Sequence, residues 1–344
     1  MIESLQVKLE RVVENESLAK NTNFRIGGPA RYFFEATSSE EMVKAVTAAR
    51  ELGVPTFVLG GGSNVLVSDA GFDGLVIKAA NRGVVIASDR GERGDLMQRL
   101  LRRFAPRNDK IVRVSAEAGV LSAFLARKTA EVGLTGFEWA ISLPGTIGGA
   151  IRGNAGCFGG EMRDVVRSVE VFDPQKSERY TLNAERLQFS YRDSIFKHME
   201  PAPIILSVKI ELKRDDSRAC LERIEATLRL RKEKQPLDAS SAGCLFKNFE
   251  FKDRGEITRL ESKLKVPEEF IVARRIPAGW IIDQLGLKGT RIGDVQVSEK
   301  HGNFMTNLGK ATADEVAQLA ALIKTRARND LGIQLHEEVQ YVGF

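Results

Sequence analysis

Residues 55–64 read Pro55-Thr-Phe-Val-Leu-Gly60-Gly61-Gly62-Ser63-Asn64, an apolar run that ends in three glycines. The apolar run predicts a β-strand, and the glycines predict a sharp turn whose backbone a ligand can approach closely. Successive N–H groups in such a turn bind phosphate oxygens, and Ser63 and Asn64 add hydrogen-bonding side chains. A single turn of this kind is more often an ordinary tight turn than a ligand site.

A second glycine-rich region reads SLPGTIGGA over residues 142–150 and NAGCFGG over residues 154–160. Because both regions follow a strand–helix pattern, together they suit a long, diphosphate-bearing ligand held along an extended cleft. Neither region fits G-x-G-x-x-G or G-x-x-x-x-G-K-[ST], so the Rossmann fingerprint and the P-loop are unsupported. The ligand could still be a dinucleotide that a different fold binds.

Composition narrows the class of protein. The 344 residues suggest two or three domains, and 51 Lys+Arg against 46 Asp+Glu give a net charge of +5, which suits an anionic ligand without indicating nucleic acid. The three cysteines and three histidines lie far apart, which predicts no metal and no disulfide framework. The longest charge-free central stretch is too short to span a membrane and the first residues are charged, so we expect a cytoplasmic protein.

Strand-like and helix-like patterns alternate along the chain. We expect a charged insertion at about 88–110 to be a solvated surface helix, although its arginines could also form a nucleic-acid patch. Ser39 is available to cap the first of the expected helices. The expected strands are 31–36, 55–59, 75–78, 111–118, 166–172, 179–183, 204–212 and 335–342, and the expected helices are 39–52, 121–132, 219–234 and 313–331.

The ordered set of motifs closely resembles the UDP-N-acetylenolpyruvoylglucosamine reductase family. Any one motif is weak, but their order from about residue 20 to the end is specific: NTNFRIGGP, GGGSN, SLPGTIGGA, NAGCFGGE, YRDS, AGCLFKN, GWIIDQ and LHEEV. The resemblance implies an α+β fold, with a two-subdomain FAD-binding domain of the vanillyl-alcohol-oxidase (PCMH) type and a C-terminal α/β substrate domain. It predicts subdomains at 1–80 and 81–215 and a substrate domain at 216–344.

The resemblance also implies a reaction. NADPH reduces bound FAD, flavin N5 gives hydride to the enolpyruvyl group of UDP-N-acetylglucosamine enolpyruvate, and protonation of the adjacent carbon yields UDP-N-acetylmuramate, a peptidoglycan precursor. The short interval between Tyr191 and Arg229 resembles the subclass without an extra tyrosine-bearing loop. We expect a monomer that binds neither nucleic acid nor membrane.

Two of the catalytic residues implied by the resemblance are Arg192 and Glu338. Hydride addition builds negative charge on the substrate carboxylate, which a planar guanidinium can stabilise through paired hydrogen bonds. The alternative for Arg192 is a surface salt bridge with Asp193. Glu338 could act as an acid or hold a proton in a short hydrogen bond. Glu337 is the competing candidate for this role, because side chains alternate along a strand and only one of the two glutamates can face the site.

The third implied catalytic residue is Cys244, which stands where the family more often has a serine that delivers the proton. A thiol with a pKa near ~8.5 is a better acid than an alcohol and stays mostly protonated at neutral pH. The alternative is a small buried hydrophobe, which is how we interpret Cys157 and Cys220.

The remaining site residues are matched to the family motifs in the same way. Phe158 stands where some members have tyrosine, and Phe249 stands where proline is usual. The expected substrate contacts are Tyr191, Arg231, Lys234, Asn248 and Gln284. The expected FAD contacts are Gly60, Gly61, Gly62, Ser63, Asn64, Ser142, Pro144, Gly145, Gly148, Gly149, Asn154 and Gly156.

Two other functions stay open at this point. The first is another FAD-dependent oxidoreductase of the same fold, acting on an alcohol or hydroxy acid. The YRDS, AGCLFKN and EEV segments favour the reductase, because they serve carboxylate and proton chemistry. The second is a non-enzymatic binding protein that uses the arginine-rich insertion. Retention of Arg192, Glu338 and a proton donor at position 244 argues against it.

Overall fold

The computed structural model describes residues 1–87 and 111–344, which form two compact units. Unit 1 contains Met1–Glu16, Arg31–Gly61 and Asp73–Arg231, and unit 2 contains Ser17–Ala30, Gly62–Phe72 and Lys232–Phe344. Each unit therefore collects segments that are distant in the sequence. The expected division into three consecutive domains stays a prediction, and the expected helix at 88–110 lies outside the described residues.

A four-stranded sheet with the order β1-β2-β5-β3 forms the first part of unit 1. Its strands are β1 (Val13–Ser17), β2 (Pro29–Ala36), β5 (Phe72–Ala79) and β3 (Thr56–Leu59), and β3 runs parallel to β5. The apolar faces of α1 (Ile2–Lys8) and α2 (Ser39–Glu51) pack against it. The N-cap of α2 is Ser38, whose side chain accepts from the Glu41 amide, so the expected cap at Ser39 was wrong by one residue.

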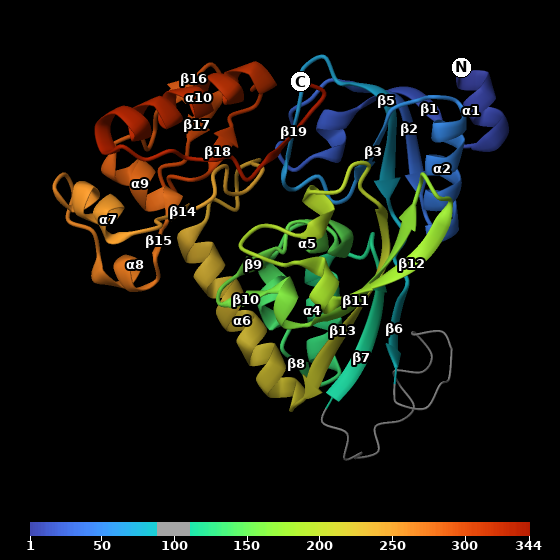
Figure 1. Cartoon of the computed structure of the whole chain (residues 1–344), viewed down its shortest axis with the longest axis horizontal. Coiled ribbons are helices and arrows are strands. Elements are labelled where there is room, and N and C mark those ends of the chain that lie inside the picture. Colours follow the sequence, from blue (N-terminus) through green and yellow to red (C-terminus); the bar gives the residue numbers. More distant parts are fainter. Residues whose placement is uncertain (88–110) are drawn as a thin grey trace. The chain divides into compact units, whose positions relative to one another are not determined.

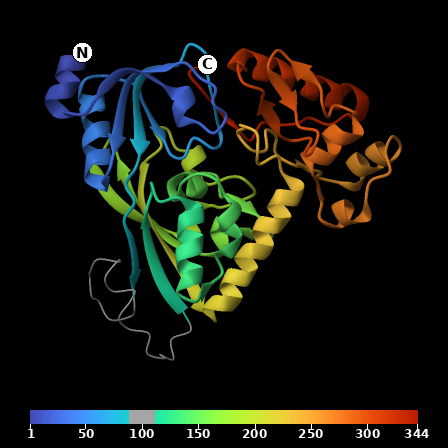
Figure 2. The same cartoon turned by 180° about the vertical axis from the view of Figure 1, so that it is seen from behind.

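The second sheet of unit 1 is antiparallel, with the order β12-β11-β13-β7-β6 and β8 paired to β13. Helices α4 and α6 lie along one face of this sheet (Figures 1 and 2) and contribute apolar side chains to its core. The short helix α5 belongs to the same core. The elements are β6 (Val84–Ala87), β7 (Ile111–Glu117), β8 (Leu134–Thr135), β11 (Val166–Asp173), β12 (Glu178–Asn183), β13 (Ile204–Arg214), α4 (Ser122–Glu131), α5 (Ile147–Arg152) and α6 (Ser217–Lys234).

Short irregular elements connect the core elements of unit 1. A hairpin pairs β9 (Gly156–Cys157) with β10 (Gly160–Glu161). Short helical turns also connect the core elements, and the first of them carries Ser142, one of the expected site residues. They are η2 (Glu138–Ser142), η3 (Met162–Asp164), η4 (Ala184–Leu187) and η5 (Ile195–Lys197).

Unit 2 packs helices and small sheets around one apolar core. Strand β19 (Gln340–Val342) runs parallel to β4 (Val65–Val67), so the end of the chain pairs with the strand that follows the first glycine turn. The other elements are η1 (Leu18–Asn21), β14 (Phe249–Glu250), β15 (Arg275–Ile276), β16 (Arg291–Ile292), β17 (Val295–Val297), β18 (Met305–Asn307), α7 (Arg254–Glu261), α8 (Glu268–Val272), α9 (Ala278–Gln284), α10 (Ala313–Arg326) and η6 (Ala327–Leu331).

The end of the chain differs from the strand expected over 335–342. Only Gln340–Val342 is a strand, and Glu337 makes a single bridge to Phe246. The helix expected over 313–331 is present, as α10 continued by η6. Within the described ranges, no helix is long and apolar enough to cross a membrane.

Candidate active site

The two glycine-rich regions meet within unit 1. A Cβ added at Gly60 would lie 2.5 Å from Thr146 Oγ1, and one added at Gly61 would overlap the backbone of Gly145. Gly148 packs against a different neighbour, because a Cβ added there would lie 2.9 Å from the Cβ of Ala118. The glycines are therefore needed for the two loops to touch, which places both expected cofactor loops side by side.

Two hydroxyl groups beside this contact are buried and make no hydrogen bond among the described residues. They are Thr146 Oγ1 and Ser122 Oγ. Thr146 is the residue before α5. Ser122 is the first residue of α4, and its backbone amide donates to the Gly145 carbonyl at 3.0 Å. A buried hydroxyl without a partner costs free energy, which a bound acceptor such as a phosphate oxygen would recover. The close glycine contacts and these hydroxyls fit the diphosphate of a dinucleotide.

Ser142, Cys157 and Arg231 form a second group next to the loops. The Cys157 thiol lies 3.3 Å from Ser142 Oγ and donates to the Trp139 carbonyl at 3.4 Å, while the Arg231 guanidinium donates to the Ser142 carbonyl. Burial raises the pKa of the Cys157 thiol, and the Ser142 hydrogen bond with the charges of Arg192 and Arg231 lowers it by less. The interpretation of Cys157 as a small buried hydrophobe therefore missed its contacts with Ser142 and the Trp139 carbonyl.

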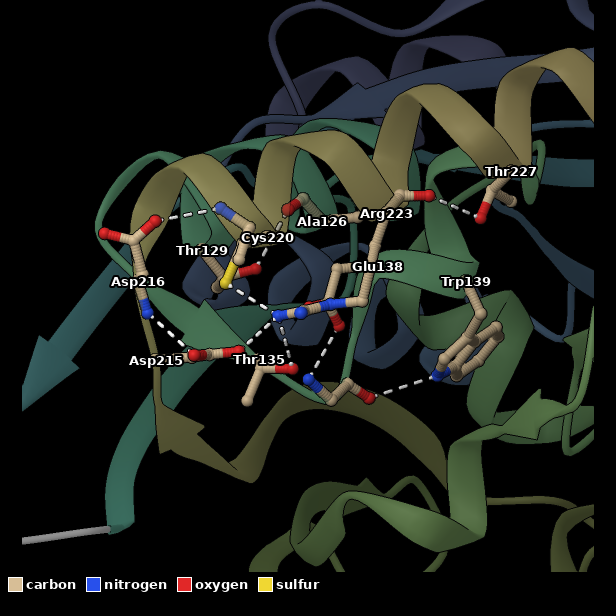
Figure 3. Close-up of polar contacts among 12 residues, drawn as sticks. Ala126, Thr129, Thr135, Glu138, Trp139, Asp215, Asp216, Cys220, Arg223 and Thr227 are labelled. Atoms are coloured by element: carbon tan, nitrogen blue, oxygen red, sulfur yellow. Dashed lines mark hydrogen bonds and ion pairs between the residues drawn. The ribbon is translucent and has the colours of Figure 1, made fainter.

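A network at the start of α6 fixes the helix that carries Arg231 (Figure 3). Arg223 Nε donates to Glu138 at 2.9 Å, and its Nη2 reaches Asp215 at 2.5 Å and Thr135 at 3.1 Å. Burial raises the pKa of Glu138, but hydrogen bonds from the amides of Glu138 and Gly136 and from Arg223 lower it more, so the carboxylate stays charged. Because Glu138 begins η2 and Ser142 ends it, α6 holds this turn at both ends.

Arg192 lies in a tight turn over Ser190–Asp193. The amide of each end residue donates to the carbonyl of the other at 3.2 Å, and Arg192 adopts a left-handed φ of 55°. Its guanidinium carbon lies 5.5 Å from the centre of the Tyr191 ring. Asp193, the surface partner of Arg192 in the alternative interpretation, accepts a 2.7 Å hydrogen bond from His198 Nε2.

Cys244 and Glu338 lie together in unit 2. The Glu338 amide donates to the carbonyl of Leu245, the residue after Cys244, at 2.8 Å. Asn64 Nδ2 donates to the Glu338 carbonyl at 3.1 Å, so the last residue of the first glycine turn contacts the same segment. The structure thus brings together three motifs that are widely separated in the sequence.

Asn303 fixes the backbone beside Cys244. Its side chain donates to the Phe246 carbonyl at 2.8 Å and accepts from the Phe246 amide at 2.9 Å, and its carbonyl accepts from the Leu245 amide at 2.8 Å. Cys244 itself bridges to Phe304. Sequence reasoning missed Asn303, because nothing in the local pattern marks it.

The two neighbouring glutamates differ in their surroundings. The Glu337 carboxylate accepts a 2.8 Å hydrogen bond from Lys324 Nζ on α10. The Glu337 side chain is therefore tied to a helix of the same unit.

The expected substrate residues occur in both units. Arg231 and Tyr191 lie in unit 1, and Lys234, Asn248 and Gln284 lie in unit 2. Asn248 Oδ1 accepts from the Ala278 amide at 3.1 Å, which caps α9, and Gln284 is exposed at the other end of that helix. Phe249, where proline is usual, pairs with Ile276 and packs against the core.

Thr146 and Ser122 are further residues that sequence reasoning missed. Thr146 is the one polar side chain within TIGGA, and that signal could have identified it. The Asn154 side chain, one of the expected cofactor contacts, is hydrogen-bonded within the protein. It bonds Glu161, Ser190 and the Arg163 amide.

Comparisons with known proteins identify the family. A family model described as FAD binding domain matches residues 30–179, and one described as UDP-N-acetylenolpyruvoylglucosamine reductase, C-terminal domain, matches residues 235–342. The curated reductase of Syntrophomonas wolfei is 34% identical over 334 residues, covering 97% of this chain and 96% of that protein. The reductase of Syntrophus aciditrophicus is 36% identical over 332 residues, covering 96% and 92%.

A solved structure agrees with the sequence relatives. The crystal structure of the reductase from Thermus caldophilus matches with a TM-score of 0.68 and 30% identity, covering 96% of this chain and 98% of that one. The expected α+β fold with an FAD-binding domain is therefore confirmed. The chain belongs to the UDP-N-acetylenolpyruvoylglucosamine reductase family and is an FAD-dependent oxidoreductase.

Proposed function

We propose that this protein uses NADPH to reduce the enolpyruvyl group of UDP-N-acetylglucosamine enolpyruvate, giving UDP-N-acetylmuramate for peptidoglycan synthesis. The observation that carries the proposal is the backbone hydrogen bond between Glu338 and Leu245, which joins an acid to the segment that bears the Cys244 thiol. Oxidation of an alcohol or hydroxy acid needs a base that removes a proton, whereas reduction of an enolpyruvyl group needs an acid that supplies one, so a thiol in this segment favours the reductase.

FAD would be held where the two glycine regions meet. Gly60, Gly61 and Gly145 allow a close approach, and the hydroxyls of Thr146 and Ser122 can donate to its diphosphate. When bound, FAD supplies the hydride chemistry. The other expected contacts in the two regions, such as Ser63 and Pro144, are part of the same proposal, except for the Asn154 side chain, which is hydrogen-bonded within the protein.

Arg192 would stabilise the charge that develops on the substrate carboxylate. Hydride addition to the enol ether leaves an enolate conjugated with that carboxylate, and a guanidinium offers two parallel N–H donors to its oxygens. The Tyr191 ring beside the guanidinium, 5.5 Å from its carbon, helps to orient its plane. Arg231 and Lys234, with Asn248 and Gln284, would bind the remainder of the substrate, whose diphosphate requires positive charge.

Cys244 would then protonate the carbon adjacent to the one that receives hydride. The S–H bond breaks, a C–H bond forms, and the resulting thiolate regains its proton from solvent. Glu338 would either supply a proton or hold one in a hydrogen bond beside the enolate. The predictions that the chain acts as a monomer in the cytoplasm stay predictions.

Variants at position 244 test this assignment under anaerobic conditions. We expect Cys244→Ser to retain measurable turnover, because a hydroxyl can deliver the proton more slowly. We expect Cys244→Ala to keep flavin reduction by NADPH and to lose re-oxidation by the enolpyruvyl sugar. Cys220→Ala is the matched control, since Cys220 is fully buried in the core of unit 1. Unimpaired turnover in Cys244→Ala would exclude a proton-donor role.

A further inference from the structure

We propose that Asn154 is a positioning residue that sets the place of Arg192, and that its side chain does not bind the cofactor. The inference rests on the proposed role of Arg192. Three observations carry it: the complete use of the Asn154 amide within the protein, the attachment of the arginine turn at both ends, and the short helix that joins this attachment to the glycine loop.

The Asn154 side chain has no donor left for a ligand. A carboxamide has two N–H bonds. The Asn154 Nδ2 group donates to Glu161 Oε2 and to the Ser190 carbonyl, both at 2.8 Å, and Oδ1 accepts from the Arg163 amide at 3.0 Å. The residue is fully buried, so these bonds are shielded from water. A flavin or phosphate oxygen would have to break one of them.

The turn that carries Arg192 is attached through both of its ends. Ser190 at one end is held by Asn154, and Ser194 just beyond the other end donates its hydroxyl to the Arg152 carbonyl at 2.7 Å. Lys197 Nζ donates to the carbonyl of Arg192 itself at 2.6 Å. Arg192 has a left-handed φ of 55°, a conformation that an arginine in a loose loop would leave.

Both attachments are made by residues at the end of α5. Arg152 is its last residue and Asn154 follows two residues later, whereas Thr146 and the glycine loop stand at its beginning. A helix of this length spans only about 9 Å, at ~1.5 Å per residue. Asn154 therefore fixes Arg192 at a set distance from the loop proposed to hold FAD, and this distance decides whether the guanidinium meets the substrate carboxylate.

Two variants of Asn154 test the inference in the holoenzyme. Asn154→Gly removes the side chain and keeps the left-handed backbone, whose φ is 41° here. Asn154→Asp keeps the shape but places a carboxylate oxygen against two acceptors, Glu161 and the Ser190 carbonyl. We expect both to bind FAD and to be reduced by NADPH as the unmodified protein is. Re-oxidation by UDP-N-acetylglucosamine enolpyruvate should slow by about 10²-fold, the size of effect that a displacement of ~1 Å can have.

Asn81 supplies the matched control. It is also fully buried in unit 1 and also makes three side-chain hydrogen bonds, to Ser39, Leu206 and Gly119. Asn81→Asp should lower the melting temperature about as much as Asn154→Asp while leaving the re-oxidation rate unchanged. A general loss of stability would slow both variants equally, and that result would overturn the inference.

Arg192→Ala separates this inference from the proposed function. Suppose that the flavin of Arg192→Ala is re-oxidised slowly and that adding Asn154→Gly to this variant slows the re-oxidation no further. Asn154 then acts through Arg192. If Arg192→Ala is slow but Asn154→Gly re-oxidises at the normal rate, the positioning role fails and the proposed function stands. Normal re-oxidation in Arg192→Ala would overturn both. Loss of FAD from the Asn154 variants would make Asn154 a cofactor ligand instead.

Discussion

Replacement of Gly60 by alanine probes the contact between the two glycine regions. The added Cβ would lie 2.5 Å from Thr146 Oγ1, whereas ordinary contacts begin at 3.4 Å, so the shortfall is 3.4 − 2.5 = 0.9 Å. Gly60 has no left-handed φ, so the effect is purely steric. Thr146 is buried and its χ1 angle is restricted, which limits how far its hydroxyl can move. Overpacking of this kind costs about 1–3 kcal/mol.

The cost should appear mainly as weaker cofactor binding. If the loops separate to relieve the overlap, binding must bring them back together, and about 1–3 kcal/mol corresponds to roughly 5- to 150-fold in affinity. FAD titration of the apoprotein, followed by flavin fluorescence, measures this. Gly153→Ala is the control, because the Cβ added at Gly153 would lie 3.8 Å from the nearest atom, the Gly149 carbonyl oxygen. The double variant Gly60→Ala/Thr146→Ala should regain stability, since the overlapping oxygen is gone, but not full affinity.

Unchanged FAD affinity in Gly60→Ala would refute the reasoning. It would mean that the contact between Gly60 and Thr146 has no part in cofactor binding. A stability loss in Gly60→Ala that persists in the double variant would show instead that the alanine strains a different neighbour.

Three further predictions follow from the geometry. Asn303→Ala should slow flavin re-oxidation by up to about 10²-fold, because the segment that bears Cys244 loses two hydrogen bonds; anaerobic stopped-flow absorbance measures it. Glu138→Gln should lower the free energy of unfolding by about 1–3 kcal/mol at neutral pH in urea titrations. Burial raises the pKa of Glu138, but hydrogen bonds lower it more, so the pKa in the folded protein lies below the ordinary value of 4.5. The stabilisation by the Glu138 carboxylate is therefore present above pH 4.5 and is lost as the pH falls through the pKa of the folded protein. The unfolding free energies of the two proteins should converge in acid. Glu338→Gln should slow re-oxidation by about 10²-fold while Glu337→Gln leaves it unchanged, and equal effects would contradict the choice between them.

The sequence predicted the longest helices and strands, because their signals are local. The apolar run before Gly60 and the helical spacing after residue 313 each depend on nearby residues only. The ends of the helices are harder to predict. Ser38 and Ser39 are both suitable N-cap residues for α2, and in the structure the extended backbone of Ser38 places it at the cap. The final strand is shorter than expected because it pairs only with the three residues of β4, a partner that the local pattern does not reveal.

Sequence motifs predicted which residues belong to the candidate site, but not which of them touch. The sequence identified the glycine regions, but their touching at Gly60 and Thr146 depends on folding of residues far apart in the chain. The same holds for the pairing of Leu245 with Glu338. The motif predicts Asn154 as a cofactor contact, and its hydrogen-bond partners are visible only in three dimensions.

The most direct test of the account is one anaerobic experiment on the purified protein. Its flavin absorbance is measured alone, after NADPH, and after UDP-N-acetylglucosamine enolpyruvate. We predict that NADPH bleaches the flavin band and that the enolpyruvyl sugar restores it, which would demonstrate both half-reactions. Bleaching without recovery on addition of the sugar would contradict the proposed substrate.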